Sequence, residues 1–420
     1  MRLLYSVMWW LALPLVLGRL WWRGRREPGY RTHLGERLGF YGRKLERRLT
    51  IMVHAVSVGE TRAAEPLVEA LLAARPDCRI LLTHMTPTGR ATGRALFAKH
   101  GERVLQSFLP YDTGFMVGRF LRHFEPAICI LMETEVWPNL IHGCAAHGVP
   151  VALVNARLSE RSLRRGRKIG SLMTDAARAI TVVAAQTEAD AARIASLGAP
   201  DVAVTGSIKF DVVPPQAALD IGAMLRARCA HRPVFLCAST REGEEALILD
   251  AFKAMDARPA GMLLVLVPRH PQRFDEVARM VVERGLTLAR RSALPDRVDA
   301  DVLLGDSMGE MFAYYAACDC AFIGGSLLPL GGQNLIEACA LGRPVLVGEH
   351  TFNFLQATEE AVAAGGALRV PDAAALLRAA AGLLDDADRR TAMGAQALAF
   401  AAHHRGATLR TVELLQRFIA

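Results

Sequence analysis

Acidic side chains follow two predicted strands of this chain at the points where the strands end. Glu60 comes shortly after the strand-like residues 51–55, and Glu133 and Glu135 come directly after the apolar residues 128–131. The carboxyl ends of parallel strands share one sheet edge, where open α/β sheets bind ligands. A carboxylate buried there is costly unless it pairs with a cation or takes part in chemistry. For Glu133 and Glu135 the pattern indicates either a catalytic role or a structural ion pair, and for Glu60 either a functional role or a favourable charge at a helix start.

Cationic side chains accompany these carboxylates. Lys209 lies in an otherwise apolar context between Ser207 and Asp211, where a point charge suits a phosphate or a carboxylate. Arg157 follows another predicted strand and precedes a basic cluster made of Arg161, Arg164, Arg165, Arg167 and Lys168. Such a cluster is usually a solvated face, but beside an acidic sheet edge it suits a phosphorylated acceptor.

A glycine-containing loop, residues 324–337, joins the predicted strand at residues 320–323 to the start of a predicted helix. Gly331 and Gly332 let the backbone approach a ligand closely, and the N–H groups of a helix start suit a phosphate. Glu337, one turn inside the helix, is placed to accept hydrogen bonds from ribose hydroxyls. A tight strand-to-helix turn, which needs no ligand, is the alternative.

Predicted strands alternate with helical patterns along most of the chain. The predicted strands are residues 51–55, 79–83, 104–108, 127–132, 150–154, 180–184, 233–237, 262–267, 301–304, 320–323 and 344–347. This alternation predicts parallel sheets covered by helices on both faces, and 420 residues exceed one ordinary core. We therefore predict an α/β fold of two doubly wound, Rossmann-like domains. The predicted domains are residues 50–206 and 207–400, with a helix at residues 401–420 that can cross back to the first domain.

Composition narrows the class of protein. Hydrophobic residues make up 52% of the chain and charged residues 22%, which fits an α/β enzyme rather than a disordered chain. A formal charge of +8 favours an anionic partner. The eight cysteines mostly lie in apolar runs without CxxC spacing, which indicates reduced core residues of a cytosolic chain and no zinc site. The chain has no Walker loop, GxGxxG, HExxH or GxSxG motif, which disfavours nucleotide hydrolysis, nicotinamide chemistry, and metallopeptidase or serine hydrolase activity.

The first 22 residues form an apolar segment that carries four tryptophans and is followed by several arginines. Tryptophans and arginines beside an apolar run favour a membrane interface, so we predict an anchor at residues 1–22 and a basic juxtamembrane segment at residues 23–49. The arginines would keep the rest of the chain in the cytoplasm. A cleaved signal peptide is the alternative, but the positive charge follows the apolar run instead of preceding it.

Ordered motifs occur throughout the chain. In the first half they are His54-Ala55-Val56-Ser57-Val58-Gly59-Glu60, Met85-Thr86-Pro87-Thr88-Gly89, Leu109-Pro110-Tyr111-Asp112, Met132-Glu133-Thr134-Glu135-Val136-Trp137-Pro138-Asn139 and Asn155-Ala156-Arg157-Leu158-Ser159. Further along they are Gly206-Ser207-Ile208-Lys209-Phe210-Asp211, Pro268-Arg269-His270-Pro271, Gly305-Asp306-Ser307-Met308-Gly309-Glu310, the loop from Gly324 and His350-Thr351-Phe352-Asn353-Phe354. Together these motifs closely resemble those of the 3-deoxy-D-manno-octulosonic acid (Kdo) transferases of lipopolysaccharide assembly.

The resemblance implies a GT-B glycosyltransferase whose two domains face a cleft, held on the cytoplasmic face of the inner membrane. It would move Kdo from CMP-Kdo to the anionic tetraacyl disaccharide precursor of lipid A, with inversion at the anomeric carbon. Glu60 matches the general base, and Glu133 and Lys209 match residues that stabilise the transition state. The CMP site would comprise Pro268, Arg269, Gly309, Glu310, Met311, Asn334, Leu335, Ile336 and Glu337.

The resemblance also implies no cofactor and no metal, because a CMP donor has a single phosphate and leaves no diphosphate to chelate. No nucleic acid partner is expected. The family often has histidine where this chain has Gln333 and proline where it has Glu349, next to the sugar-nucleotide loop. Two rival hypotheses are a GT-B transferase or epimerase that uses a UDP sugar, and a membrane-tethered module that binds anionic lipid or nucleic acid through its basic face.

Overall fold

The computed structural model describes residues 1–44 and 46–419. The chain divides into two compact units, the first made of Met1–Asp211 with the chain from Arg405 onward, and the second made of Val212–His404. The first unit thus extends to Asp211, beyond the predicted boundary at residue 206. Its carboxyl-terminal segment begins at Arg405, whereas the predicted one begins at residue 401.

The first unit contains a seven-stranded sheet in which every strand pair is parallel. Its strands are β1 (Thr50–His54), β2 (Arg79–His84), β3 (Val104–Phe108), β4 (Ile128–Met132), β5 (Val151–Ala156), β6 (Val182–Ala185) and β7 (Val202–Val204). Their order is β3-β2-β1-β4-β5-β6-β7, so the chain builds outward from β1 in one direction and then in the other. The switch point of this doubly wound sheet lies between β1 and β4.

Successive residues of these strands face two separate cores, which explains their unbroken apolar runs. In β1, Ile51 and Val53 pack with α4 (Glu65–Ala74) and α19 (Ala407–Gln416), whereas Met52 packs in the core that contains α6 (Gly114–Phe124) and α7 (Pro138–Ala146). The other helices of this unit are α1 (Arg2–Arg23), α2 (Leu34–Arg37), α3 (Val58–Ala63), α5 (Pro87–Leu96), α8 (Glu160–Ile169), α9 (Ser171–Arg178) and α10 (Glu188–Ala195).

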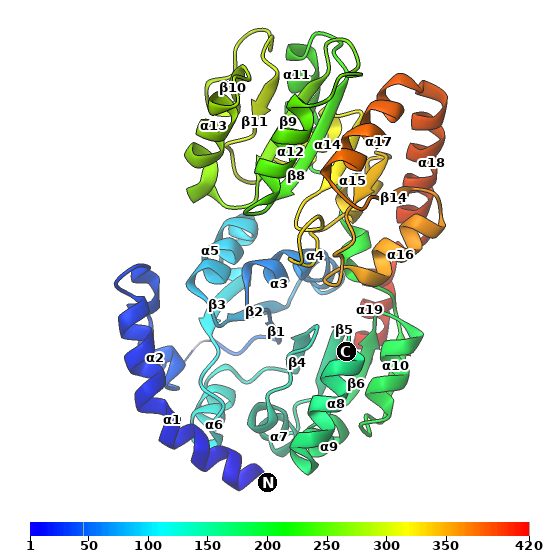
Figure 1. The fold of residues 1–420 in the computed structure, drawn as a ribbon. Coiled ribbons are helices and arrows are strands. Elements are labelled where there is room, and N and C mark those ends of the chain that lie inside the picture. Colours follow the sequence, from blue (N-terminus) through cyan, green and yellow to red (C-terminus); the bar gives the residue numbers. More distant parts are fainter. Residues whose placement is uncertain (45, 420) are drawn as a thin grey trace. The chain divides into compact units, whose positions relative to one another are not determined.

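The second unit repeats this plan with its own seven-stranded parallel sheet. Its strands are β8 (Val234–Thr240), β9 (Leu263–Pro268), β10 (Leu288–Arg290), β11 (Val302–Leu304), β12 (Cys320–Ile323), β13 (Val345–Val347) and β14 (Ala367–Arg369). The order is β10-β11-β9-β8-β12-β13-β14, which places the switch point between β8 and β12. Figure 1 shows the helices of each unit packed around its own sheet.

Alternate residues of β8, Phe235 and Cys237, pack in a core with side chains of α12 (Glu244–Lys253), α13 (Phe274–Glu283) and α17 (Ala373–Asp385). The helices of this unit are α11 (Gln216–Arg228), α12 (Glu244–Lys253), α13 (Phe274–Glu283), α14 (Met311–Ala317), α15 (Ile336–Ala340), α16 (Leu355–Ala363), α17 (Ala373–Asp385) and α18 (Ala387–His403). All eight cysteines are buried and free, as predicted for reduced core residues.

The last helix, α19, packs on the first unit, against α4 and the 3-10 turn η3 (Ile208–Asp211). Asp211 holds its first turn, because its carboxylate accepts hydrogen bonds from the N–H groups of Gly406, at 2.6 Å, and Thr408, at 2.5 Å. A carboxylate at a helix start satisfies backbone donors that have no partner inside the helix. The start of α19 is thereby held next to η3, the turn that also contains Lys209.

Three short strands, β7, β10 and β14, were not predicted, because three-residue edge strands carry too few residues to show a period. The helical segment that follows β1 is interrupted at Ala64, where α3 ends and α4 begins. Pro66 explains the interruption: it lacks an N–H group, and its ring excludes the carbonyl of the residue four positions earlier.

The apolar N-terminal segment forms one helix, α1 (Arg2–Arg23), with Pro14 inside it. In the described part of the chain it is the one helix long and apolar enough to cross a membrane, with a mean hydropathy of 1.6.

Candidate active site

Glu60 lies at the switch point of the first sheet, in the first turn of α3 directly beyond β1. Its side chain turns back toward the strand: one carboxylate oxygen accepts a hydrogen bond from the Val56 N–H at 2.8 Å, and the other accepts one from the Ser57 hydroxyl at 3.4 Å. The carboxylate thus reaches back past the N-cap residue, Ser57, and holds the turn that leads into the helix, although Ser57 makes no side-chain cap bond of its own. The helix-start role considered for Glu60 is therefore present.

The hydrogen bonds from Val56 and Ser57 still leave this carboxylate able to act as an acid or a base. Burial, followed by the negative charges of Glu135 and Glu133, raises the pKa of Glu60 to about 7, against the opposing hydrogen bonds from Val56 and Ser57. A carboxylate with a pKa near neutrality is matched to the work of a general base. Glu60 can hold a proton at neutral pH and give it up again, which an exposed glutamate does poorly.

Glu133 directly follows β4 on the other side of the same switch point and is 7% exposed. Its carboxylate is clamped between two cations: Lys209 Nζ lies 2.7 Å from Oε1, and Arg157 Nε lies 3.2 Å from Oε2. The ion pair proposed from sequence as an alternative is thus formed, and it involves a lysine as well as an arginine. The arrangement brings two predicted residues, Glu133 and Lys209, into direct contact.

Asn155 was quoted as part of a sequence motif but was not predicted as a site residue. It is fully buried at a register shift of β5 against β6, with a φ of 53°. Its side-chain oxygen accepts a hydrogen bond from the Ile208 N–H at 3.2 Å, and its carbonyl accepts one from Gln186 at 2.8 Å. Asn155 therefore positions the backbone next to Lys209. Its sequence signal was an amide at a strand end where left-handed backbone is needed.

Glu135 completes the acidic side of this edge. Its carboxylate accepts a hydrogen bond from the indole N–H of Trp137 at 2.9 Å, and burial, with the charge of Glu133 adding to it, raises its pKa. The Trp137 ring meets His54 edge-on, with centroids 5.9 Å apart. Burial lowers the pKa of His54 to about 3, so this histidine is neutral at physiological pH and is a poor base.

In the second unit the loop after β12 lies at the switch point between β8 and β12, where the sequence predicted a nucleotide site. Gly325, Gly331 and Gly332 have φ values of 73°, 94° and 74°, a region that residues with a Cβ rarely adopt. A Cβ at Gly331 would lie 2.6 Å from the ring of Phe352. Glycine is needed at these positions by the fold of the loop itself.

A buried carboxylate fixes the first part of this loop. Glu244, at the start of α12, is fully buried and accepts hydrogen bonds from the N–H groups of Arg241, Gly325 and Leu327 at 2.9, 2.6 and 3.0 Å. The N–H of Gly332 donates to the carbonyl of Gly325 at 2.7 Å. Several N–H groups of this loop, which the sequence suggested as phosphate ligands, therefore already donate hydrogen bonds within the protein. The helix start that follows Gly332 remains the candidate anion site.

The predicted CMP-binding residues lie at the carboxyl ends of β9, β11 and β12. Pro268 is the last residue of β9, and the N–H of Arg269 donates to the carbonyl of Thr240 at 2.9 Å, which places Arg269 beside the end of β8. Gly309 has a φ of 82° in the loop before α14, and Met311 begins that helix. Glu310 forms an ion pair with Arg291 at 2.9 Å.

The remaining members of the predicted CMP site form the start of α15. The Asn334 side chain accepts a hydrogen bond from the Ile336 N–H at 3.1 Å and donates one to the Glu337 carboxylate at 3.2 Å. Leu335 and Ile336 are buried. Helices α14 and α15 pack against each other, and burial, with the charge of Glu337 second, raises the pKa of Tyr315 on α14.

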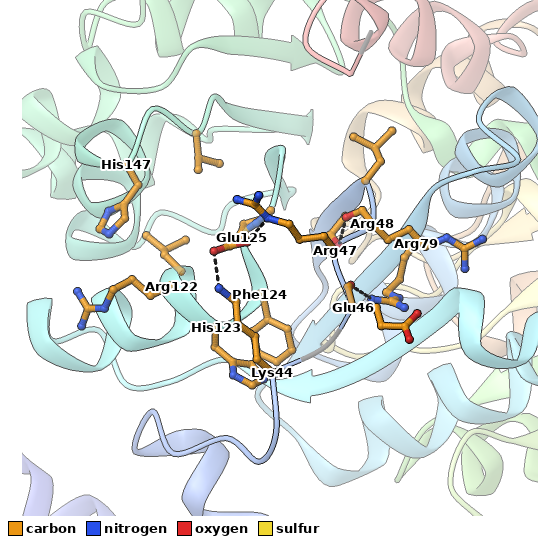
Figure 2. A pocket seen from close by; sticks show the side chains of 15 residues that line it. Lys44, Glu46, Arg47, Arg48, Arg79, Arg122, His123, Phe124, Glu125 and His147 are labelled. Carbon is orange, nitrogen blue, oxygen red and sulfur yellow. Dashed lines mark hydrogen bonds and ion pairs between the residues drawn. The ribbon is translucent and has the colours of Figure 1, made fainter.

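A basic hollow of about 630 Å³ lies elsewhere on the first unit, near the amino-terminal ends of β1 and β4 (Figure 2). Lys44 and Arg47 in it pair with Glu125, at 2.6 and 3.5 Å. Arg48 and Arg79 donate to backbone carbonyls. None of the predicted site residues lines the hollow, and its cations are largely engaged with the protein, so the sheet edge with Glu60 remains the candidate site.

Among residues 1–44 and 46–419, no cluster of histidine, cysteine, aspartate and glutamate is arranged to hold a metal ion.

Two doubly wound parallel sheets, each with polar residues gathered at its switch point, define an α/β protein of the GT-B glycosyltransferase type. Solved structures agree at the level of fold. A glycosyltransferase from Rickettsia africae matches with a TM-score of 0.61 at 11% identity, over 89% of this chain and 99% of that one. The UDP-GlcNAc 2-epimerase of Neisseria meningitidis matches with a TM-score of 0.60 at 16% identity, over 88% of this chain and all of that one.

Sequence comparison identifies the family within this fold. The family model described as "3-Deoxy-D-manno-octulosonic-acid transferase (kdotransferase)" matches residues 32–212. The 3-deoxy-D-manno-octulosonic acid transferase of Bordetella pertussis is 48% identical over 97% of this chain and 96% of its own length. That of Haemophilus influenzae is 38% identical over 100% of this chain and 99% of its own length. The chain belongs to the 3-deoxy-D-manno-octulosonic acid transferase family and is a glycosyltransferase.

Proposed function

We propose that this enzyme moves Kdo from CMP-Kdo to a hydroxyl of the tetraacyl disaccharide precursor of lipid A, at the cytoplasmic face of the inner membrane, with inversion at the anomeric carbon. The observation that carries the proposal is the carboxylate of Glu60, which lies at a switch-point edge and has a pKa raised to about 7. An inverting transfer needs one base to remove the proton of the attacking hydroxyl. Glu60 takes that role.

The proposed step is a direct displacement. The acceptor oxygen forms a bond to the anomeric carbon of Kdo, the bond from that carbon to the CMP phosphate oxygen breaks, and the hydroxyl proton passes to Glu60. The negative charge that leaves with CMP grows during the step, so cations and backbone N–H groups near the phosphate accelerate it. For this role we propose Arg269 and the α15 start, with Pro268, Gly309, Glu310, Met311, Asn334, Leu335, Ile336 and Glu337 holding the rest of CMP.

Glu133 and Lys209 have a joint role in this proposal. The contact of 2.7 Å between them orients the lysine ammonium, and Arg157 on the other oxygen prevents Glu133 from turning away. Kdo and the phosphorylated acceptor are both anionic, so the oriented cation on Glu133, whose own charge acts on Glu60, would stabilise the negative charges of the substrates. Replacing Lys209 by methionine would leave Glu133 paired only with Arg157, and we expect a lower kcat.

The decisive experiment is product analysis with purified protein, CMP-Kdo and the tetraacyl disaccharide. We expect a mass increase of one or more Kdo residues on the lipid, with CMP released in equal amount, and product formation by the Glu60→Gln variant that is slower by about 10²-fold or more. The variant should still be stabilised against thermal unfolding by CMP, because the proposed nucleotide residues are unchanged. Stabilisation by UDP in preference to CMP would contradict the donor assignment, and normal transfer by Glu60→Gln would contradict the assignment of the base.

A further inference from the structure

Helix α1 presents two different faces along its whole length. One stripe is half-buried against the first unit and recurs with the helical period: Tyr5, Ser6, Trp9, Ala12, Leu13, Val16, Leu17 and Leu20. The opposite face is apolar and exposed, with Leu11 and Leu15 exposed by 74% and 78%. A soluble surface helix carries charged residues on its outer face, so an apolar outer face indicates an apolar partner.

The amino-terminal part of α1 is fastened to the unit by specific contacts. The Tyr5 hydroxyl donates to the carboxylate of Asp112 at 3.0 Å, and Asp112 is itself 1% exposed and accepts the N–H groups of Asn139 and Leu140 at the start of α7. The Asn139 amide donates to the Ser6 hydroxyl at 3.0 Å. These polar contacts tie the first turns of α1 to the start of a core helix.

The carboxyl-terminal part of α1 is fastened to the same unit at another place. Arg31 donates to the carbonyl of Trp21 at 2.9 Å, and the Arg23 guanidinium lies 4.4 Å from the centre of the Tyr30 ring. Tyr30 is buried in the 3-10 turn η1 (Pro28–Arg31), which packs against α5. Figure 1 shows α1 in dark blue running beside its own unit.

Attachment at both ends constrains how α1 can meet a bilayer. A helix of 22 residues is about 33 Å long, close to the roughly 30 Å thickness of the hydrocarbon core. If α1 crossed the bilayer, Asp112 at one end and Tyr30 at the other would approach opposite membrane surfaces, with the folded unit between them inside the lipid. While these contacts hold at both ends, α1 therefore cannot span the bilayer, although it is long enough to do so.

We propose that α1 does not cross the membrane but lies in the plane of one leaflet of an anionic bilayer, with its exposed face in the acyl-chain boundary and its other face on the first unit. This inference refines the membrane association proposed above and is independent of which sugar is transferred.

Charge and aromatic residues identify the occupant of this face as lipid. The exposed arginines Arg19, Arg23, Arg25 and Arg26 lie at one end of the helix, and the guanidinium of Arg25 lies 4.9 Å from the centre of the Trp21 ring. Tryptophan and arginine together suit the headgroup level of an anionic membrane. The apolar surface continues onto the exposed Phe115 of α6, whose ring centre lies 6.4 Å from that of Trp10.

The test uses the buried state of all eight native cysteines, which gives a low background for thiol labelling. The Arg2→Cys variant is reconstituted at the outer surface of anionic vesicles and treated with a membrane-impermeant maleimide, with Asp388→Cys, an exposed site in the second unit, as the reference. An in-plane helix leaves both thiols outside, so we expect them to react at the same rate. Protection of Arg2→Cys until detergent is added, with Asp388→Cys reactive throughout, would overturn the proposal.

A second measurement separates the two faces of α1. An environment-sensitive fluorophore is attached at Leu15→Cys on the exposed face and, as the matched control, at Leu13→Cys on the half-buried stripe. We expect strong quenching of the Leu15 probe by lipids that carry a nitroxide near the headgroup, and weak quenching of the Leu13 probe. Equal quenching at both sites, strongest with nitroxides at the chain ends, would indicate a span and refute the inference.

A distinct result would show that the exposed face of α1 does not bind lipid. If the protein does not float with anionic vesicles, and Leu15→Cys instead forms a disulfide between two copies of the chain, the exposed face is a protein interface and the proposal is wrong. Kdo transfer to a detergent-dispersed acceptor is measured alongside, so the reaction is judged separately from the membrane geometry.

Discussion

The replacement of Glu60 by glutamine should raise the stability of the first unit at alkaline pH while it strongly slows transfer. The carboxylate is held in a place that disfavours its charge, since burial and two neighbouring glutamates raise its pKa from 4.5 to about 7. Glutamine keeps one oxygen, which can accept the hydrogen bond from the Val56 N–H, and its NH₂ group can donate to the Ser57 hydroxyl, but it carries no charge. The substitution therefore removes the charge penalty while both contacts can be kept.

The sign of the pH dependence follows from the raised pKa. Below pH 4.5 the carboxyl is protonated in the folded and the unfolded chain, so the charge has no effect on stability. Between pH 4.5 and about 7 the unfolded chain loses the proton first, which destabilises the fold progressively. Above pH 7 the whole penalty is present. A difference between the variant and the parent should thus appear at pH 8 and fade toward pH 5.

The structure also sets the magnitude. A pKa raised from 4.5 to about 7 corresponds to at most about 3.5 kcal/mol, since each pH unit equals about 1.4 kcal/mol. Glu60 is only partly buried, so solvent screening reduces the expected gain to about 1 kcal/mol. For a unit of this size, that gain raises the melting temperature by roughly 2–4 °C. The kcat should fall by about 10²–10⁴-fold, as is typical when a general base is lost.

The assay is thermal unfolding of both proteins at pH 8 and pH 5, together with the rate of Kdo transfer at pH 8. The Glu188→Gln variant is the matched control, because Glu188 is an exposed carboxylate in the first turn of α10. We expect the control to change neither the melting temperature nor the rate. A lower melting temperature of Glu60→Gln at pH 8 would show that the carboxylate is stabilising and would refute the raised pKa on which the assignment of the base depends.

Three further predictions test other parts of the site. The Glu135→Gln variant removes a charge that raises the pKa of Glu60, so the acid limb of kcat/KM against pH should move to lower pH, and an unmoved limb would contradict the coupling. The Gly331→Ala variant would place a Cβ against the Phe352 ring at a φ of 94°, so we expect its affinity for CMP, measured by calorimetry, to fall about tenfold or more. The Gly309→Ala variant, which has no atom within 4 Å of the added Cβ, should lose less CMP affinity. The Glu244→Gln variant replaces one acceptor oxygen with an NH₂ group facing backbone donors, so the second unit should melt at lower temperature, and an unchanged melting profile would be inconsistent with its anchoring role.

Much of the fold could be predicted from local pattern. The apolar runs of β1 and β4 indicate strands buried on both faces, and the structure divides their successive residues between two cores. Strand and helix alternation then requires parallel pairing, because a helix carries the chain back to the starting edge. The short strands β7, β10 and β14 and the break at Ala64 escaped prediction, since they depend on edge pairing and on one proline.

The site residues were predicted by type and position, but their relations were not. Sequence indicated that Glu133 would need a cation, and only the folded chain showed that Lys209 and Arg157 both supply it, from segments far along the sequence. The role of Asn155 was likewise hidden, because it rests on a backbone hydrogen bond to Ile208, more than fifty positions away. Pairing between distant segments depends on the order of strands in the sheet, which local periodicity does not encode.

The sequence by itself determined the kinds of element, the family and the acidic edge, because hydrophobic period and ordered motifs are local properties. The tertiary structure decided which charges meet, and therefore the pKa of Glu60, because burial and the charges of Glu133 and Glu135 act through space. It also decided that α1 is bound at both ends to its own unit, which its apolar composition could not reveal, since a helix that spans a membrane and one that lies on it share the same residues.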